Sequence, residues 1–152
     1  MVRNTIFRGL RFSDKWHEDE FIINDYILRM EKAVCTDTRL YYYRQRSTGI
    51  TGDKKNMRHM EALEAVRKRI DIFRKEEYES VFKDVLYSYF QNALIMYIKL
   101  LEKGKGFELK KGIYPQYRKT LLYNRKELGI RKLLRYGLFL VSPRLFRRRY
   151  WT

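Results

Sequence analysis

The sequence predicts an α+β fold that is mostly helical, and three observations support this prediction. Apolar residues recur at helical spacing over three stretches, 21–32, 60–75 and 78–100. Two shorter stretches, 33–36 and 40–45, are rich in β-branched or aromatic residues, which favour strands. Hydrophobic residues make up 45% of the 152 residues, which is enough for a packed core and argues against a disordered chain.

The predicted elements fall into two domains, 1–52 and 53–152. Acidic residues at 18–20 open the first helix, and the two short strands follow it. Residues 47–53 combine Ser, Thr, Gly and Asp, a composition typical of turns, and they provide the internal boundary.

The second domain is predicted to be helical throughout. A run of alternating lysine and glycine at 103–106 ends the helix over 78–100. The segment 114–151 then predicts one or two short amphipathic helices, broken at Ser142-Pro143 because proline disfavours a helical residue before it.

The net charge of +16 is concentrated in the last third of the chain. Residues 103–152 contain 15 Lys or Arg against two acidic residues, a net +13, which leaves +3 for residues 1–102. Such a segment attracts anionic lipid or nucleic acid. Its apolar residues are mostly bulky aliphatics in clusters, which bury in acyl chains rather than stack on bases. We therefore expect 103–152 to bind an anionic membrane surface, and nucleic acid is the disfavoured partner.

The single cysteine, Cys35, excludes an intrachain disulfide framework and a cysteine-rich zinc site, and it indicates a reducing compartment. No signal peptide or transmembrane span is recognisable in the sequence, since the longest apolar run near the C-terminus covers only 138–141. These observations predict a cytoplasmic location.

The first candidate site combines His17 with the carboxylates of Glu18, Asp19 and Glu20. A carboxylate within hydrogen-bond reach can take a proton from a hydroxyl as that hydroxyl attacks. The structural alternative is that Asp19 caps the following helix, and composition alone favours it, because Asp is common at that position. A metal site is not predicted, since there is no His-Glu-x-x-His motif and His59 has no pattern of ligands around it.

The second candidate site is the pair Arg44 and Arg46. Two residues apart on a strand, they would share one face and could clamp a diphosphate. Two solvated arginines on an edge strand are the structural alternative, which the spacing alone favours. The tyrosines at 41–43 are likewise more typical of strand packing than of a ligand platform.

Taken together, the two motifs resemble glycosyltransferase family 2, the GT-A-fold enzymes that make bacterial capsule, exopolysaccharide and related surface glycans. The resemblance covers roughly 5–52, and the basic tail near Ser142-Pro143-Arg144-Leu145 is loosely similar to that of membrane-associated members. The resemblance depends on the order of these elements along the chain. A basic lead-in comes first, then the run His17-Glu18-Asp19-Glu20-Phe21, a helix, a short strand, and the run Leu40-Tyr41-Tyr42-Tyr43-Arg44-Gln45-Arg46-Ser47.

The resemblance implies that the family's Glu-Asp pair falls on Glu18 and Asp19, with Asp19 as the base. Asp19 would deprotonate a hydroxyl of a glycan acceptor, which attacks the anomeric carbon of a nucleotide-sugar donor with inversion. His17, Arg44 and Arg46 would contact the substrates. In the complete enzyme a divalent cation, magnesium or manganese, offsets the charge of the leaving diphosphate.

The sequence departs from the family at its beginning. The nucleotide-binding half of these enzymes lies before the Glu-Asp motif, whereas sixteen residues precede His17, and none of the seven aspartates forms an Asp-x-Asp pair for the cation. We therefore expect the C-terminal portion of a truncated or split glycosyltransferase that binds no cofactor and has no activity alone. Another chain would carry the missing half, at the inner face of the plasma membrane. The alternatives are a non-catalytic basic helical protein that binds anionic membrane or RNA, and a gene remnant.

Overall fold

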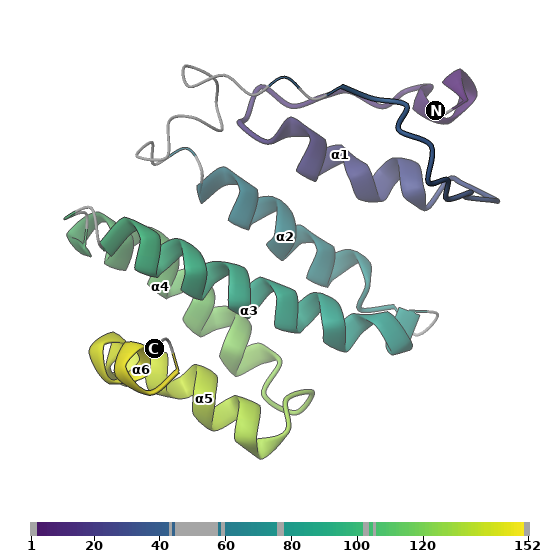
Figure 1. Cartoon of the computed structure of the whole chain (residues 1–152). Coiled ribbons are helices and arrows are strands. Elements are labelled where there is room, and N and C mark those ends of the chain that lie inside the picture. Colours follow the sequence, from purple (N-terminus) through teal and green to yellow (C-terminus); the bar gives the residue numbers. More distant parts are fainter. Residues whose placement is uncertain are drawn as a thin grey trace. The chain divides into compact units, whose positions relative to one another are not determined.

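The computed structural model describes residues 3–42, 44, 58, 60–75, 78–101, 104 and 106–150. These residues form a short 3-10 helix and six α-helices (Figure 1). The chain divides into two compact units, Met1–Ala65 and Val66–Thr152. The helices in chain order are η1 (Asn4–Phe7), α1 (Glu18–Ile27), α2 (Met60–Ile72), α3 (Glu79–Leu101), α4 (Gly106–Tyr123), α5 (Ile130–Val141) and α6 (Pro143–Tyr150).

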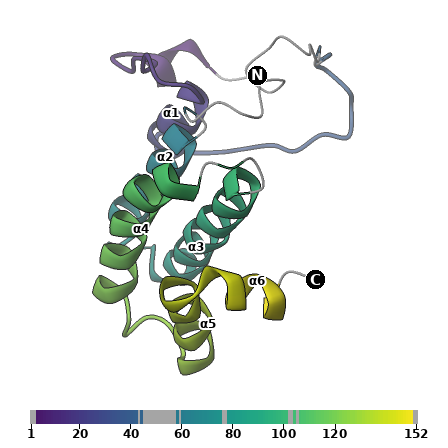
Figure 2. The ribbon, with the colours of Figure 1, turned by 90° about the vertical axis from the view of Figure 1, so that its left-hand side faces the viewer.

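The α+β prediction is wrong, because the described residues contain no β-strand and the fold is all-α. The predicted strand at 33–36 and the described beginning of the one at 40–45 lie in an irregular ribbon that leaves the helices (Figure 2). Val34, Leu40 and Tyr42 are 81%, 76% and 89% exposed. Strand propensity reflects packing against neighbouring strands, so a β-like composition without such neighbours does not form a sheet.

Unit Met1–Ala65 is built around α1. Ile22 is buried, as the predicted apolar face requires. The guanidinium of Arg29 donates hydrogen bonds to the carbonyls of Ile6 and Arg8, at 3.1 and 2.8 Å, and so fastens η1 to the end of α1. The helix ends at Ile27, five residues before the predicted end near Lys32.

Unit Val66–Thr152 is centred on α3 and α4, which pack against each other. The buried side chains of α3 follow the predicted apolar face closely, and they include Phe82, Tyr89, Ala93 and Tyr97. The helix α4 begins earlier than the sequence predicts, at Gly106 directly after the connecting run, and it contributes Ile113, Tyr117 and Leu121 to the core.

The helix α5 completes this core with aromatic side chains. Tyr136 stacks on Phe90 of α3, with ring centroids 4.7 Å apart. Phe139 lies at the centre of a cluster of rings with centroids within 6 Å, formed with Tyr97, Tyr114, Tyr117 and Phe146. The hydroxyls of Tyr114 and Tyr117 donate hydrogen bonds to the carbonyls of Phe139 and Tyr136.

The predicted break at Ser142-Pro143 is confirmed. Ser142 is extended, with φ −152° and ψ 99°, and Pro143 is the first residue of α6. The Ser142 hydroxyl accepts a hydrogen bond from the backbone N–H of Leu145 at 3.3 Å. Ser142 thus caps the beginning of α6 with its side chain, and Pro143 supplies a φ angle that already suits the first helical position.

None of the helices within the described ranges is long and apolar enough to cross a bilayer.

Candidate functional site

The first candidate site lies at the beginning of α1, whose first turn contains Glu18, Asp19 and Glu20. His17 precedes this turn and adopts the left-handed conformation, with φ 59° and ψ 44°. Among the described residues other than glycine it is the only one with a positive φ. A side chain in this region costs about 1 kcal/mol or more, and such residues are over-represented at functional sites. The backbone therefore stores strain directly before the candidate base.

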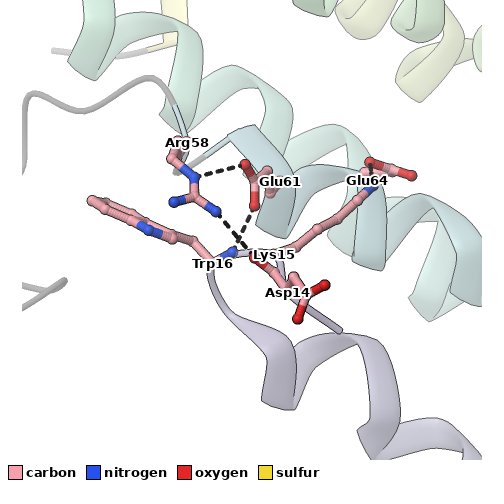
Figure 3. Close-up of polar contacts among 6 residues, drawn as sticks. All are labelled: Asp14, Lys15, Trp16, Arg58, Glu61 and Glu64. Atoms are coloured by element: carbon pink, nitrogen blue, oxygen red, sulfur yellow. Dashed lines mark hydrogen bonds and ion pairs between the residues drawn. The ribbon is translucent and has the colours of Figure 1, made fainter. Parts of the chain in front are cut away.

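A polar cluster holds the loop that leads into His17 (Figure 3). The Glu61 carboxylate accepts a hydrogen bond from the backbone N–H of Trp16 at 2.6 Å, and one from Arg58 Nε at 3.1 Å. Arg58 also donates to the Asp14 carbonyl at 3.1 Å, and its guanidinium lies over the Trp16 ring. We call the residues of this arrangement the Glu61 cluster: Asp14, Lys15, Trp16, Arg58, Glu61 and Glu64.

Lys15 adds a second attachment of the same loop. Its ammonium group forms an ion pair with Glu64 at 2.5 Å and lies 5.2 Å from the centre of the Phe21 ring. Two consecutive residues before His17, Lys15 and Trp16, are thus each tied to a glutamate of α2. These contacts, all within unit Met1–Ala65, support the strained backbone at His17.

The pKa of Glu61 is shifted by this arrangement. Loss of solvent would raise the pKa of the carboxyl, but the hydrogen bonds from Arg58 and from the Trp16 N–H outweigh this effect, together with the charges of Arg58 and Lys15. The net result is a pKa below the usual 4.5, so the carboxylate form prevails near neutral pH. Its contribution to holding the loop is present above pH 4.5 and is lost as the pH falls through the lowered pKa.

The two carboxylates of the predicted catalytic pair differ in exposure. Asp19 is exposed, whereas Glu18 is half-buried. The alternative prediction, that Asp19 is the residue that caps α1, is wrong, because the N-cap residue is His17 and Asp19 lies inside the helix. Asp19 Oδ1 still accepts a hydrogen bond from the Glu20 N–H at 3.0 Å, so it pairs with an amide of the first turn.

The structure does not bring the predicted arginines to this site. Arg44 is exposed and makes no hydrogen bond or ion pair with the residues that the structure describes, and Arg46 lies outside those residues. Likewise, no group of three or more His, Cys, Asp or Glu that could hold a metal ion occurs within the described ranges.

Two cavities lie away from the carboxylates. The larger, about 700 Å³, is lined by Arg3, Arg29 and Lys32 at the C-terminal end of α1. A ten-residue helix is about 15 Å long, so this basic groove lies too far away to share a reacting atom with Asp19.

The second cavity, about 480 Å³, belongs to unit Val66–Thr152 and lies between α2 and α4. Its arginines already have partners in the protein. Arg67 forms an ion pair with Asp71 at 3.3 Å, and Arg74 donates a 2.6 Å hydrogen bond to Asn124 Oδ1. Arg74 also lies over the Tyr123 ring at 4.5 Å. The arrangement is therefore that of a structural polar network.

Trp16, Arg58, Glu61 and Glu64 were not predicted from the sequence as supports of the candidate site. A partial signal existed, because Arg58, Glu61 and Glu64 recur every three residues and therefore share one face of a helix. The partners of Glu61 and Glu64 lie 45 and 49 residues earlier in the chain, and that of Arg58 lies 44 residues earlier, separations that no local pattern bridges.

Comparisons of this chain with protein-family models, with curated proteins and with solved structures gave no match.

Proposed function

We propose that this chain forms the acceptor-side part of an inverting glycosyltransferase. Asp19 takes the proton from an acceptor hydroxyl, whose oxygen forms the new bond to the anomeric carbon of the donor sugar. The bond between that carbon and the diphosphate breaks, and the nucleoside diphosphate leaves with the electron pair. The observation that carries the proposal is an exposed Asp19 carboxylate in the first turn of α1, two residues after the strained His17.

The support around Asp19 is what a positioned base requires. A base accelerates proton transfer only when it is held within hydrogen-bond reach of the reacting hydroxyl. The Glu61 cluster fixes the loop immediately before α1. Asp19 therefore extends from a turn whose position the surrounding contacts determine.

The donor site is assigned to a polypeptide segment outside these 152 residues. The ribbon over 33–42 supports this assignment, because its large apolar side chains Val34, Leu40 and Tyr42 are uncovered. Exposed apolar side chains of this size are available to pack against a second surface. In this arrangement Arg44, at the end of the same ribbon, contacts the donor diphosphate together with Arg46.

The divalent cation, magnesium or manganese, belongs to the donor side in this proposal. It offsets the charge that develops on the leaving diphosphate, and hard cations of this kind take carboxylate oxygens as ligands. The sequence contains no Asp-x-Asp pair that would supply them. The chain itself provides the base and the docking surface.

The test co-expresses the chain with the polypeptide encoded directly upstream and measures nucleoside diphosphate release from a panel of nucleotide sugars. We expect Asp19→Asn to reduce turnover by a factor of about 10² to 10⁴, the usual contribution of a general base. Asp25→Asn, an exposed aspartate on the same helix, is the matched control and should leave turnover unchanged. Full turnover by Asp19→Asn would remove Asp19 as the base, and no release from any combination would contradict the transferase proposal.

A further inference from the structure

The helix α5 has two apolar faces, of which the core uses only one. Tyr136 and Phe139 are buried, with 2% and 1% of their surfaces exposed. On the opposite side Ile130, Leu134 and Val141 are 68%, 66% and 84% exposed. Their spacings of four and seven residues place them on one line along the helix. We call these three residues the α5 stripe.

Nothing in the described structure covers the α5 stripe. Gly137 lies on the same line, between Leu134 and Val141, and a Cβ atom built there would meet no atom within 4 Å. Leu145 extends the apolar surface onto α6, where it is also exposed. Both helices, which follow each other in the chain (Figure 2), therefore carry exposed apolar side chains.

Cations dominate the same two helices. Residues 128–152 contain seven Lys or Arg and no Asp or Glu. Arg131 on α5 is exposed, as are Arg144, Arg147 and Arg149 on α6, whereas Lys132 lies over the Tyr87 ring on the other side of α5. An apolar line beside exposed cations, with no acidic residue among them, is the pattern of a helix that lies in the interface of an anionic bilayer.

We propose that α5 and α6 form a docking face for an anionic lipid bilayer. The α5 stripe and Leu145 insert at the boundary between head groups and acyl chains, while the surrounding cations contact lipid phosphates. The proposal does not depend on glycosyl transfer, because lipid binding requires neither a donor site nor Asp19. It narrows the membrane-binding region predicted for 103–152 to a few residues on α5 and α6.

Two other occupants fit the surface less well. Nucleic acid without sequence preference binds to exposed aromatic rings, but the rings of α5 and α6 whose side chains the structure describes, Tyr136, Phe139 and Phe146, are buried in the core. A second copy of the chain would bring like charges together, since residues 66–152 contain 22 Lys or Arg against eight acidic residues, a net +14. Charge and side-chain type therefore both favour lipid.

The test is co-sedimentation of the full chain with vesicles of phosphatidylcholine, with or without phosphatidylglycerol. We expect binding to the anionic vesicles at low salt and release at high salt. The double variant Leu134→Ser/Val141→Ser should bind at least about tenfold more weakly, because two inserted side chains are lost. Leu122→Ser, which changes an exposed leucine of α4, is the matched control and should bind like the wild type.

Circular dichroism and thermal melting keep the test independent of folding, and the double variant should melt like the wild type. Equal binding to neutral and anionic vesicles would overturn the role of the cations. Unchanged binding of the double variant would overturn the role of the α5 stripe. If the chain does not bind vesicles, two other results would overturn the lipid proposal. Nanomolar RNA binding at physiological salt would identify RNA as the partner. A concentration-dependent dimer that the double variant abolishes would identify a second copy of the chain.

Discussion

At the scale of single residues, the candidate site depends on contacts between distant parts of the chain. His17 is held in an unfavourable backbone conformation, and the two residues before it are attached to Glu61 and Glu64. A strained residue persists only where its surroundings determine the geometry. The Glu61 cluster is therefore as necessary for positioning Asp19 as the first turn of α1.

The protonation of Glu61 provides a direct test of this coupling. The Trp16 N–H donates to a carboxylate whose pKa is lowered below 4.5, so its amide proton resonance should shift upfield on acidification, with a midpoint below pH 4.5. The measurement is an NMR titration of the Trp16 amide. Glu61→Gln should abolish the titration, whereas Glu64→Gln should preserve it. A midpoint at or above 4.5 would contradict the assigned hydrogen bonds.

The sequence could predict only half of this site. His17, Glu18 and Asp19 are adjacent, so a local motif identifies them together. The partners of the preceding loop are separated from it by 44 to 49 residues, and their pairing depends on how α2 folds back. Periodicity marks the face of a helix but does not specify which loop meets that face.

At the scale of elements, α5 shows which apolar face a helix buries. The core takes the aromatic pair Tyr136 and Phe139, which lie among the rings of α3 and α4, and leaves the aliphatic α5 stripe in solvent. Large aromatic side chains bury more surface than aliphatic ones and gain further from edge-to-face contacts.

Two alanine variants on α5 should therefore differ strongly in stability. Phe139→Ala removes the central ring of the aromatic cluster and should lower the free energy of unfolding by about 3–5 kcal/mol. Leu134→Ala, on the exposed side of the same helix, should change it by less than about 0.5 kcal/mol. Urea denaturation followed by circular dichroism measures both. Similar losses for the two variants would mean that both faces of α5 are packed.

The helices were easier to predict than the extended segments, for a physical reason. Hydrogen bonds of a helix close within five residues, so the stretches 60–75 and 78–100 contain most of the information for α2 and α3. The break before Pro143 was equally local. A strand needs partners elsewhere, and the tyrosine-rich composition after residue 40 contains no information about whether they exist.

At the scale of the whole molecule, charge and buried hydroxyls are distributed unevenly. Residues 1–65 have 12 basic and ten acidic side chains, a net +2, whereas residues 66–152 have a net +14. Burial raises the pKa of Tyr89, Tyr117 and Tyr136, and also that of half-buried Tyr114. All four belong to unit Val66–Thr152, so the stability of this unit should decrease at alkaline pH.

Loss of stability at high pH should follow from these tyrosines. Their folded-state pKa values lie above the usual 10, so the stabilisation they provide is complete below pH 10 and decreases as the pH rises towards the folded values. Urea midpoints between about pH 8 and pH 11 test this. Tyr117→Phe should make the decrease shallower, by up to about 1.4 kcal/mol per pH unit above 10. An unchanged slope would exclude Tyr117 as a source.

Because the α5 stripe is exposed, its side chains can affect function without affecting stability, two properties that usually change together. Mutations in a core alter stability and function at once, but Ile130, Leu134 and Val141 lie outside the packing of α3, α4 and α5. Changes to these side chains can therefore alter membrane binding with little effect on folding. Related sequences that bind lipid should accordingly keep apolar residues along this line, and they should keep aromatic residues at positions 136 and 139 for packing.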